Sequence, residues 1–330
     1  MESCTLVDEF SLISKYFRPL ALSNPAALGL MDDAALLVPS SGKQIVITCD
    51  ALVDGVHFPD ESTPRDVAAR ALRANLSDLA AMGAAPVAYT LALIAPAGTD
   101  GRWFKDFTAQ LYEDQKKYRI FLIGGDTVVT PGPLSVSITA FGEVPVNSAL
   151  TRSGARVGDS IFVTGSIGDA YLGLRALSGE LEEDSTVDVG VFVDKFCRPE
   201  PRLALASGLL GIATAAVDVS DGLLADIGQL CRASDVGAVV QEMAVPLSAG
   251  AEFLAGKNPG LRSKLLDSGD DYELVLVVPG ENKGDFSEII KKYSVPITEI
   301  GLITDTDEVV LIDDNGNRVE RERGGYRHFF

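Results

Sequence analysis

The residues with the clearest chemical potential are aspartates that follow or interrupt apolar runs. Asp78 is the strongest example, because it lies beside Leu79, Ala80 and Ala81 in the apolar, helix-forming stretch Asn75–Gly83. A carboxylate in such surroundings needs a partner, and a metal ion is the strongest candidate. Further aspartates with similar neighbours are Asp32, Asp33, Asp50, Asp126, Asp218 and Asp221. We expect strands and helices to bring these acids together at a site where Mg²⁺ binds a nucleotide polyphosphate.

Two further features fit phosphate recognition. Gly124 and Gly125 precede Asp126 after an apolar run, and a glycine backbone can approach a phosphate closely. Arg152 is a candidate for a bidentate phosphate contact. Each feature taken singly also has a structural explanation, since aspartates and glycines are common in turns and helix caps and arginines are common on surfaces. The combination, repeated in both halves of the sequence, favours a functional site.

Several common catalytic motifs are absent from the sequence. It has no G-x-x-x-x-G-K-[ST] phosphate loop, no protein-kinase catalytic loop and no Rossmann glycine fingerprint. Two histidines without a G-x-S-x-G motif disfavour a serine-hydrolase triad. The acids therefore remain the main candidates, and they suit phosphoryl transfer, which depends on positioning and charge neutralisation more than on covalent chemistry.

Composition restricts the class of protein further. A length of 330 residues suggests two domains, and 46% hydrophobic residues are enough for sizeable cores. The formal net charge of −19 argues against nucleic acid and anionic membranes as partners, although bridging divalent metals still allow an acidic protein to bind a nucleotide. There is no CxxC pair, no apolar run of transmembrane length and no signal-peptide pattern at the start. These features predict a cytoplasmic protein.

Strands and helices are interleaved along the chain, which predicts an α/β or α+β class. In the first half we expect helices over 9–20, 64–82 and 103–118 and strands over 34–39, 44–49, 87–94, 120–123 and 134–144. In the second half we expect helices over 170–177, 201–210 and 223–234 and strands over 160–164, 215–219, 237–241 and 274–278. The pattern restarts near residue 148, so we expect domains over 1–148 and 149–330.

Taken in order, these motifs resemble those of the thiamine-monophosphate kinases, in the superfamily that includes aminoimidazole ribonucleotide synthetase. The resemblance extends over nearly the whole chain, from Glu9 to Phe329. Its markers are Asp32–Ala35, Asp50–Phe58, Asn75–Gly83, Gly124–Thr127, Leu150–Gly154, Asp218–Leu223 and Gly269–Leu274. It implies a two-domain aminoimidazole ribonucleotide synthetase-like fold. The N-terminal domain, with a mixed sheet, would bind ATP and Mg²⁺ and form a homodimer, and the C-terminal α/β domain would complete the active site.

The resemblance also implies a reaction, the phosphorylation of thiamine monophosphate to thiamine diphosphate with ATP as co-substrate and several Mg²⁺ ions. By position, the implied Mg²⁺ ligands are Asp33, Thr48, Cys49, Asp50, Asp78, Asp126, Asp218 and Asp221. The implied ATP contacts are Gly125, Asp126, Arg152 and Ser220, and the implied substrate contacts are His57, Asp270 and Tyr326. No catalytic acid, base or nucleophile is expected. The acceptor phosphate, with a second pKa of about 6, is mostly dianionic at pH 7 and can attack the γ-phosphate directly and in line.

Three positions depart from the family pattern. Met31 stands where a second glycine is usual, and it would be strained if the position required a positive φ. Cys49 replaces a hydroxyl residue, so its backbone carbonyl would be the better Mg²⁺ ligand. Asp270 is shorter than the frequent glutamate. We expect these departures to weaken or alter metal binding at worst, without changing the reaction.

Two alternatives stay open. One is another ATP-dependent synthetase of the superfamily. The selenophosphate and hydrogenase-maturation members would need a reactive cysteine that neither Cys4 nor the C-terminal tail supplies, and aminoimidazole ribonucleotide synthetase fits the motifs less well. The other alternative is a non-catalytic protein that binds a nucleotide or thiamine phosphate, having lost activity through Met31 and Cys49.

Overall fold

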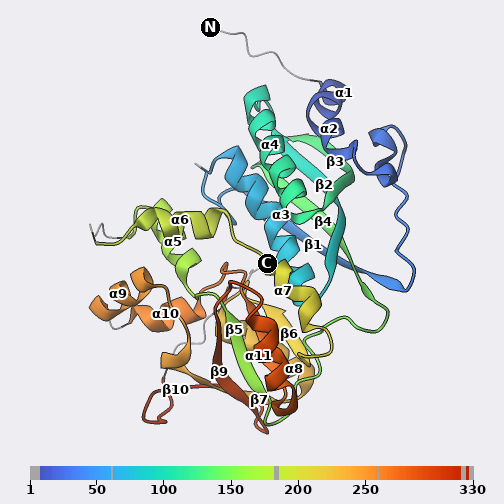
Figure 1. The fold of residues 1–330 in the computed structure, drawn as a ribbon. Coiled ribbons are helices and arrows are strands. Elements are labelled where there is room, and N and C mark those ends of the chain that lie inside the picture. Colours follow the sequence, from blue (N-terminus) through green and yellow to red (C-terminus); the bar gives the residue numbers. More distant parts are fainter. Residues whose placement is uncertain (1–7, 61, 182–185, 259, 321–324, 327–330) are drawn as a thin grey trace. The chain divides into compact units, whose positions relative to one another are not determined.

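The chain is described by a computed structural model that covers residues 8–60, 62–181, 186–258, 260–320 and 325–326 (Figure 1). It divides into two compact units, the first formed by Met1–Leu79 and Ala85–Asn147 and the second by Ala80–Ala84 and Ser148–Phe330. The first unit contains a four-stranded sheet and the second a six-stranded sheet. Helices accompany both sheets, so the α/β class expected from the sequence is confirmed.

The sheet of the first unit has the strand order β1-β4-β2-β3. Its strands are β1 (Lys43–Val53), β2 (Ala85–Pro96), β3 (Phe121–Thr130) and β4 (Ser135–Pro145). The β1–β4 and β4–β2 pairs are antiparallel, whereas β2 and β3 are parallel. Burial alternates residue by residue along β4, which means that one face of the sheet is much better covered than the other.

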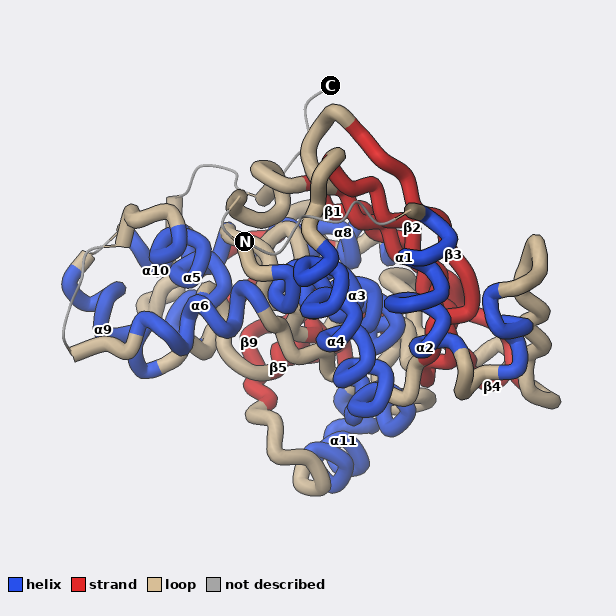
Figure 2. The backbone as a smooth tube through the Cα atoms, turned by 90° about the horizontal axis from the view of Figure 1, so that it is seen from above, coloured by secondary structure: helices blue, strands red, loops and turns tan. Residues whose placement is uncertain are grey.

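The helical elements of the first unit are α1 (Glu9–Leu12), the π-helical η1 (Ile13–Phe17), α2 (Arg18–Ala21), the 3-10 helix η2 (Pro25–Leu30), α3 (Pro64–Ala81) and α4 (Gly101–Tyr118). Helices α3 and α4 lie side by side (Figures 1 and 2). A buried ion pair joins them, with Arg73 Nη2 of α3 2.8 Å from Asp114 Oδ1 of α4. Helix α4 also contacts the sheet, because the Gln115 side chain lies 3.0 Å from the Tyr89 hydroxyl of β2. These contacts fix α3 relative to the sheet.

The strand expected over 34–39 is wrong, because this segment is irregular. Leu36 and Val38 are 66% and 82% exposed, while Ala35 and Leu37 pack against a small cluster that includes Ala27. The alternation of side chains that suggested a strand therefore reflects packing of one side of an extended loop. Residues 44–49 do form a strand, but β1 continues past them to Val53.

The sheet of the second unit has the strand order β10-β7-β9-β5-β8-β6. Its strands are β5 (Ser160–Thr164), β6 (Ala215–Asp218), β7 (Gly237–Gln241), β8 (Leu274–Val278), β9 (Ile297–Thr304) and β10 (Val309–Ile312). The β10–β7 pair is parallel, and the other pairs among the described strands of this sheet are antiparallel. All five residues of β8 are buried, which indicates that both faces of this sheet are covered near its centre.

The helices of the second unit are α5 (Asp169–Leu177), α6 (Val189–Cys197), α7 (Leu203–Ala206), α8 (Leu223–Ser234), α9 (Ala249–Lys257), α10 (Leu261–Asp267) and α11 (Lys283–Ile290). Short 3-10 turns are η3 (Ser207–Leu209), η4 (Glu242–Ala244) and η5 (Gly280–Asn282). Helix α8 buries Leu223, Ile227 and Leu230 on one face, and this stripe belongs to the core around the sheet. No helix in the described ranges combines the length and the apolar character needed to cross a membrane.

Candidate active site

One group of implied metal ligands lies between β1 and α3. Thr48 and Asp50 are two residues apart on β1, so their side chains point to the same face of the sheet. The Thr48 hydroxyl donates a hydrogen bond to the Asp78 carboxylate of α3. The stretch that stood out in the sequence therefore presents its one acid to the sheet, beside a strand that carries a second acid.

The two carboxylates of this group influence one another. Burial, and secondarily the negative charge of Asp78, raises the pKa of Asp50 from 3.8 to about 6. Two neighbouring acids held in a half-buried position are the arrangement that a cation stabilises. The donors are hard carboxylate and hydroxyl oxygens, which suit Mg²⁺. The side chains present thus fit the implied ion.

Cys49 is directed away from this group. It lies between Thr48 and Asp50 on β1, so its side chain points to the opposite, exposed face of the sheet. There its sulfur is 3.7 Å from the Ser137 hydroxyl of β4. The thiol is therefore remote from the carboxylates, and a role as metal ligand through its backbone carbonyl stays a prediction.

A second group of implied residues shares a cavity of about 450 Å³ in the same unit. Its lining includes the acids Asp32, Asp33 and Asp126, the hydroxyl residues Thr90 and Thr127, and the glycines Gly124 and Gly125. Asp126 accepts a hydrogen bond from the backbone N–H of Thr127 at 2.8 Å. The Thr127 hydroxyl is buried and has no hydrogen-bond partner among the residues that the structure describes. A buried polar atom without a partner is costly, which fits a cavity that receives a polar ligand.

The double glycine has a structural cause as well. Gly125 and Asp126 lie inside β3 and not in a loop after a strand. A Cβ at Gly125 would lie 2.0 Å from the backbone oxygen of Leu91 on β2, so any side chain there would collide with the neighbouring strand. Close packing of β2 and β3 thus explains this glycine, and its contact with ATP stays a prediction.

The expected strain at Met31 is absent. Met31 has a φ of −117°, which any residue adopts readily. The left-handed conformation falls on the three preceding residues, Leu28, Gly29 and Leu30, with φ of 48°, 66° and 54°. The unusual backbone therefore lies just before the two acids, Asp32 and Asp33, but does not involve the residue that departs from the family pattern.

His57, an implied substrate contact, is fixed by backbone interactions in the first unit. Its Nδ1 accepts a hydrogen bond from the N–H of Val53 at 3.1 Å. Its carbonyl oxygen accepts one from the Arg70 side chain of α3 at 3.0 Å. Because Nδ1 is engaged in this way, the imidazole is oriented by the end of β1, and it is half-buried.

In the second unit the implied ligands follow β6. Asp218 is the last residue of this strand and is 3% exposed, and the loop that follows carries Ser220 and Asp221. The N–H groups of Ser220, Asp221 and Gly222 all donate to Oδ2 of Asp226, at 3.0, 3.0 and 3.1 Å. Burial, and secondarily the charge of Asp221, raises the pKa of Asp226 to about 7.

A second loop, residues 268–273, lies against this one. The N–H of Asp270 donates to the backbone carbonyl oxygen of Ser220, and the N–H of Tyr272 donates to that of Val219, both at 2.9 Å. Asp270 and Tyr272 have φ of 71° and 51°. Asp tolerates the left-handed conformation better than most residues, which gives a local reason for Asp270, whereas a left-handed Tyr272 is strained. Strain of this kind persists only where the surroundings impose it.

Buried carboxylates anchor the second loop. Asp271 accepts hydrogen bonds from the N–H groups of Gly168 and Ala170, at 2.7 and 3.2 Å, and burial raises its pKa well above the usual range. Glu273 is 3% exposed and forms a bidentate ion pair with Arg202. These interactions hold the segment that follows the implied substrate contact Asp270.

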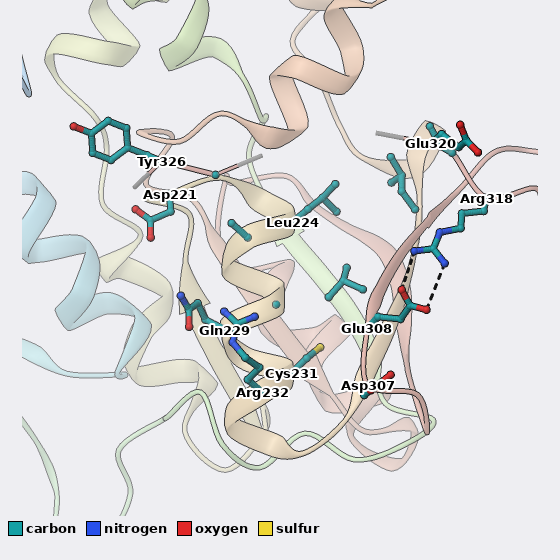
Figure 3. A pocket seen from close by; sticks show the side chains of 16 residues that line it. Asp221, Leu224, Gln229, Cys231, Arg232, Asp307, Glu308, Arg318, Glu320 and Tyr326 are labelled. Atoms are coloured by element: carbon teal, nitrogen blue, oxygen red, sulfur yellow. Dashed lines mark hydrogen bonds and ion pairs between the residues drawn. The ribbon is translucent and has the colours of Figure 1, made fainter. Parts of the chain in front are cut away.

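Tyr326 lies beside Asp221 at one end of a cavity of about 570 Å³ (Figure 3). Its backbone N–H donates to the backbone carbonyl oxygen of Asp221 at 3.0 Å, and Tyr326 is 51% exposed. The middle of the cavity is lined by α8, and the far end holds Arg318, which forms an ion pair with Glu308 at 2.8 Å. The implied substrate contacts Asp270 and Tyr326 are thus tied to the same loop that carries the implied metal ligand Asp221.

Arg152, the implied phosphate contact, has an exposed side chain on a well-anchored backbone. The Ser234 hydroxyl, at the end of α8, donates to the Arg152 carbonyl oxygen at 2.9 Å. The same hydroxyl accepts hydrogen bonds from the N–H groups of Gly154 and Ala155. The guanidinium thus extends from a fixed position into solvent.

The implied ligands do not form a complete metal site by themselves. Among the described residues, no three Asp, Glu, His or Cys side chains are grouped so that they could hold a metal ion. This agrees with the usual binding of Mg²⁺ by one or two carboxylates together with water and substrate phosphates.

Asp226 is the residue that the sequence reasoning missed. It lies in the first turn of α8 and is 1% exposed. Its position four residues after Gly222 is a usable signal, because an acid one turn into a helix can reach back to unpaired N–H groups before the helix. The sequence alone favours Ser220, Asp221 and Gly222 as the cap at this point and gives no role to Asp226.

The chain matches two family models. The model described as AIR synthase related protein, N-terminal domain, matches residues 31–144, and the corresponding C-terminal domain matches residues 156–314. The thiamine-monophosphate kinase of Escherichia coli strain K12 is 40% identical over 322 residues, which are 97% of this chain and 98% of that protein.

Solved structures give a consistent result. The thiamine-monophosphate kinase of Stenotrophomonas maltophilia K279a is similar with a TM-score of 0.84 and 39% identity, over 95% of this chain and 98% of that one. AaThiL complexed with AMPPCP and TMP is similar with a TM-score of 0.77 and 28% identity, over 98% and 97% of the two chains. The chain belongs to the thiamine-monophosphate kinase family of the AIR synthase related proteins.

Proposed function

We propose that the chain transfers the γ-phosphate of ATP to thiamine monophosphate and so produces thiamine diphosphate. The observation that best supports this is the pair of carboxylates between β1 and α3, where burial and Asp78 raise the pKa of Asp50 to about 6. Such a pair is suited to a phosphate-bound cation, and a related protein has been solved with AMPPCP and TMP.

The chain's own residues would bind and orient the two phosphate groups. Asp50, Asp78 and the Thr48 hydroxyl would hold Mg²⁺ in the first unit, and Asp218 and Asp221 would do so in the second. The ion, when bound, offsets the repulsion between the two anionic substrates. Arg152, with its exposed guanidinium, would contact an ATP phosphate.

The remaining implied ligands have corresponding tasks. Asp33 and Asp126 would bind the ion at the cavity of the first unit, and Gly125 would let ATP approach β3 closely there. Ser220 would contact ATP from the loop after β6, and Cys49 would contribute its carbonyl oxygen. None of these groups needs to exchange a proton with the substrates, because the acceptor phosphate is already dianionic, so transfer is direct and in line.

The substrate side needs a site for a cation, because thiamine contains a thiazolium ring. Asp270 supplies a negative charge and Tyr326 an exposed aromatic ring, both held by backbone hydrogen bonds to the loop after β6. An aromatic face together with a carboxylate favours a flat organic cation. His57 would complete the recognition of thiamine monophosphate.

We also propose a homodimer formed through the sheet of the first unit. Helices α3 and α4 cover one face of this sheet, and Ile47, Cys49 and Ala51 of β1 are exposed on the other. Ile47 is 62% exposed, which is unfavourable for a sheet face left in water. An Ile47→Lys variant should therefore be monomeric by light scattering where the natural chain is dimeric. The free thiols of Cys49 and Cys231 agree with a reducing compartment, the cytoplasm.

The test of the reaction is product formation from ATP and thiamine monophosphate with Mg²⁺, with thiamine and aminoimidazole precursors as alternative acceptors. We expect thiamine diphosphate from the monophosphate alone. An Asp50→Asn variant should lose at least about 100-fold in turnover. The matched control is Asp106→Asn, since Asp106 is an exposed acid of α4 outside the site.

Two results would redirect the proposal. Tight binding of Mg·ATP by calorimetry without product from any acceptor would favour the non-catalytic binding protein, and product from an aminoimidazole precursor would favour another synthetase of the superfamily. Trapping of labelled phosphate on the protein would contradict direct transfer.

A further inference from the structure

The loop between β6 and α8, residues 219–222, has an unusual division of its hydrogen bonds. Three peptide groups join these residues, and their N–H groups belong to Ser220, Asp221 and Gly222. All three N–H groups point to the same side and donate to a single oxygen, Oδ2 of Asp226. The distances, 3.0, 3.0 and 3.1 Å, show that none of the three is a marginal contact. Asp226 is therefore the common acceptor for the whole loop.

The carbonyl groups of the same three peptides are used on the other side. The oxygens of residues 219, 220 and 221 accept N–H groups from Tyr272, Asp270 and Tyr326, at 2.9, 2.9 and 3.0 Å. Because a peptide group is planar, its N–H and C=O point in opposite directions. Fixing the three N–H groups on Asp226 therefore aims the three carbonyls at the segments that carry Asp270 and Tyr326.

The packing leaves little room for another arrangement. A Cβ at Gly269 would lie 1.9 Å from the Ser220 oxygen, and a Cβ at Gly222 would lie 2.6 Å from the Asp267 oxygen. A Cβ at Gly325, next to Tyr326, would lie 2.8 Å from the Cβ of Ala225. Two chain segments, 267–272 and 325–326, thus lie close against the loop and the start of α8, so a rotation of the loop peptides would move both of them.

An ordinary helix cap does not account for this geometry. A capping side chain satisfies N–H groups in the first turn of the helix itself. Asp226 instead satisfies the N–H groups of two residues before α8 and of Gly222, its N-cap. The carboxylate acts on the loop that precedes the helix, where Ser220 and Asp221 lie.

We propose that Asp226 is a positioning residue that sets the peptide orientation of residues 219–222. In this role it aligns the nucleotide and metal side of the loop, Ser220 and Asp221, with the thiamine phosphate side, Asp270 and Tyr326. The inference rests on the proposed function for the roles of these four residues. The peptide alignment itself rests on the hydrogen bonds alone.

The test compares two substitutions at this position. Asp226→Ala removes the acceptor, so we expect the KM values for both Mg·ATP and thiamine monophosphate to rise about tenfold or more. Asp226→Asn keeps an acceptor oxygen at the same place, so both KM values should return to within about threefold of the natural chain. The matched control is Asp313→Ala, which removes a carboxylate that accepts N–H groups from Asn315 and Asn317 in a turn without implied site residues.

Hydrogen exchange followed by mass spectrometry gives a readout that does not depend on activity. In Asp226→Ala the peptides that contain residues 219–222 and 268–272 should exchange faster, while the peptide that contains β8 should be unchanged. Faster exchange throughout the second unit would instead show general destabilisation and would overturn the positioning role. Unchanged KM values in Asp226→Ala, or an Asn variant as impaired as the Ala variant, would also overturn it. Absence of thiamine diphosphate with the natural chain would refute the proposed function, while the exchange pattern would still decide the alignment.

Discussion

The substitution Asp50→Asn should stabilise the metal-free protein while it abolishes turnover. Burial and the charge of Asp78 raise the pKa of Asp50 from its ordinary value of 3.8 to about 6. This difference of about 2.2 corresponds to about 3 kcal/mol of unfavourable free energy when the group is ionised, at roughly 1.4 kcal/mol per pKa unit. Asp50 is partly exposed, so solvent screening reduces the effect, and we expect a gain of about 1–2 kcal/mol.

The gain should depend on pH in a definite direction. A carboxyl whose pKa is raised by folding binds more protons in the folded than in the unfolded state between pH 4 and 6. Stability of the natural chain therefore falls as the pH rises through this window and is level above it, whereas Asp50→Asn lacks this loss. The difference between the two proteins should be larger at pH 7.5 than at pH 5.

Thermal unfolding in EDTA at these two pH values measures the effect. At pH 7.5 we expect the variant to unfold about 2–8 °C higher, given roughly 2–4 °C per kcal/mol for a domain of this size. The control Asp106→Asn should unfold like the natural chain, and added Mg²⁺ should stabilise the natural chain more than the variant. A variant that is less stable than the natural chain in EDTA would refute the reasoning, because the carboxylate would then support the fold and not a ligand.

Three further predictions test the second unit. Gly269→Ala should raise the KM for thiamine monophosphate about tenfold, because its Cβ would meet a backbone oxygen at 1.9 Å, whereas Gly280→Ala, in open space, should leave the kinetics unchanged. Arg202→Met removes the ion-pair partner of the buried Glu273 and should lower the free energy of unfolding, measured in urea, by about 3–5 kcal/mol. Arg65→Met, at an exposed ion pair with Glu113, should lower it by less than about 1 kcal/mol. Tyr326→Ala should raise the KM for thiamine monophosphate about fivefold without changing the KM for ATP. Tyr326→Phe should restore it, since in the proposed role the ring and not the hydroxyl would contact the cation. Equal effects of Ala and Phe would contradict this role.

Regular elements with clear end signals were predictable from the sequence. Helix α8 begins and ends at the expected residues because Gly222 precedes its apolar stripe and Asp235 ends it in a left-handed conformation, with a φ of 56°. Strand β8 was equally clear, since five consecutive apolar residues of β type form a strand buried on both faces. By contrast, β9 and β10 were not anticipated. Thr298, Glu299 and Gly301 interrupt the apolar pattern of β9, and β10 is an apolar run of four residues, too short to stand out.

The site was less predictable, because its geometry depends on contacts between distant segments. Asp50 and Asp126 were expected at strand ends but lie within β1 and β3, since these strands continue through polar residues once a neighbour supplies hydrogen bonds. The contact of Thr48 with Asp78 joins residues 30 positions apart in the sequence, which no local pattern reveals. Asp226 is recognisable only when the peptide orientations of the preceding loop are known.

The alternation of side chains along β1 makes Cys49 a convenient chemical reporter. Its thiol is exposed on the sheet face opposite Thr48 and Asp50, while Cys197 and Cys231 are buried. In a Cys4→Ser background, a maleimide dye should therefore modify Cys49 selectively, without a label among the carboxylates of the other face. If the proposed dimer forms through this face, the rate of labelling should fall as the protein concentration rises. Assembly could in this way be followed during turnover, because the label would lie on the sheet face opposite Thr48 and Asp50.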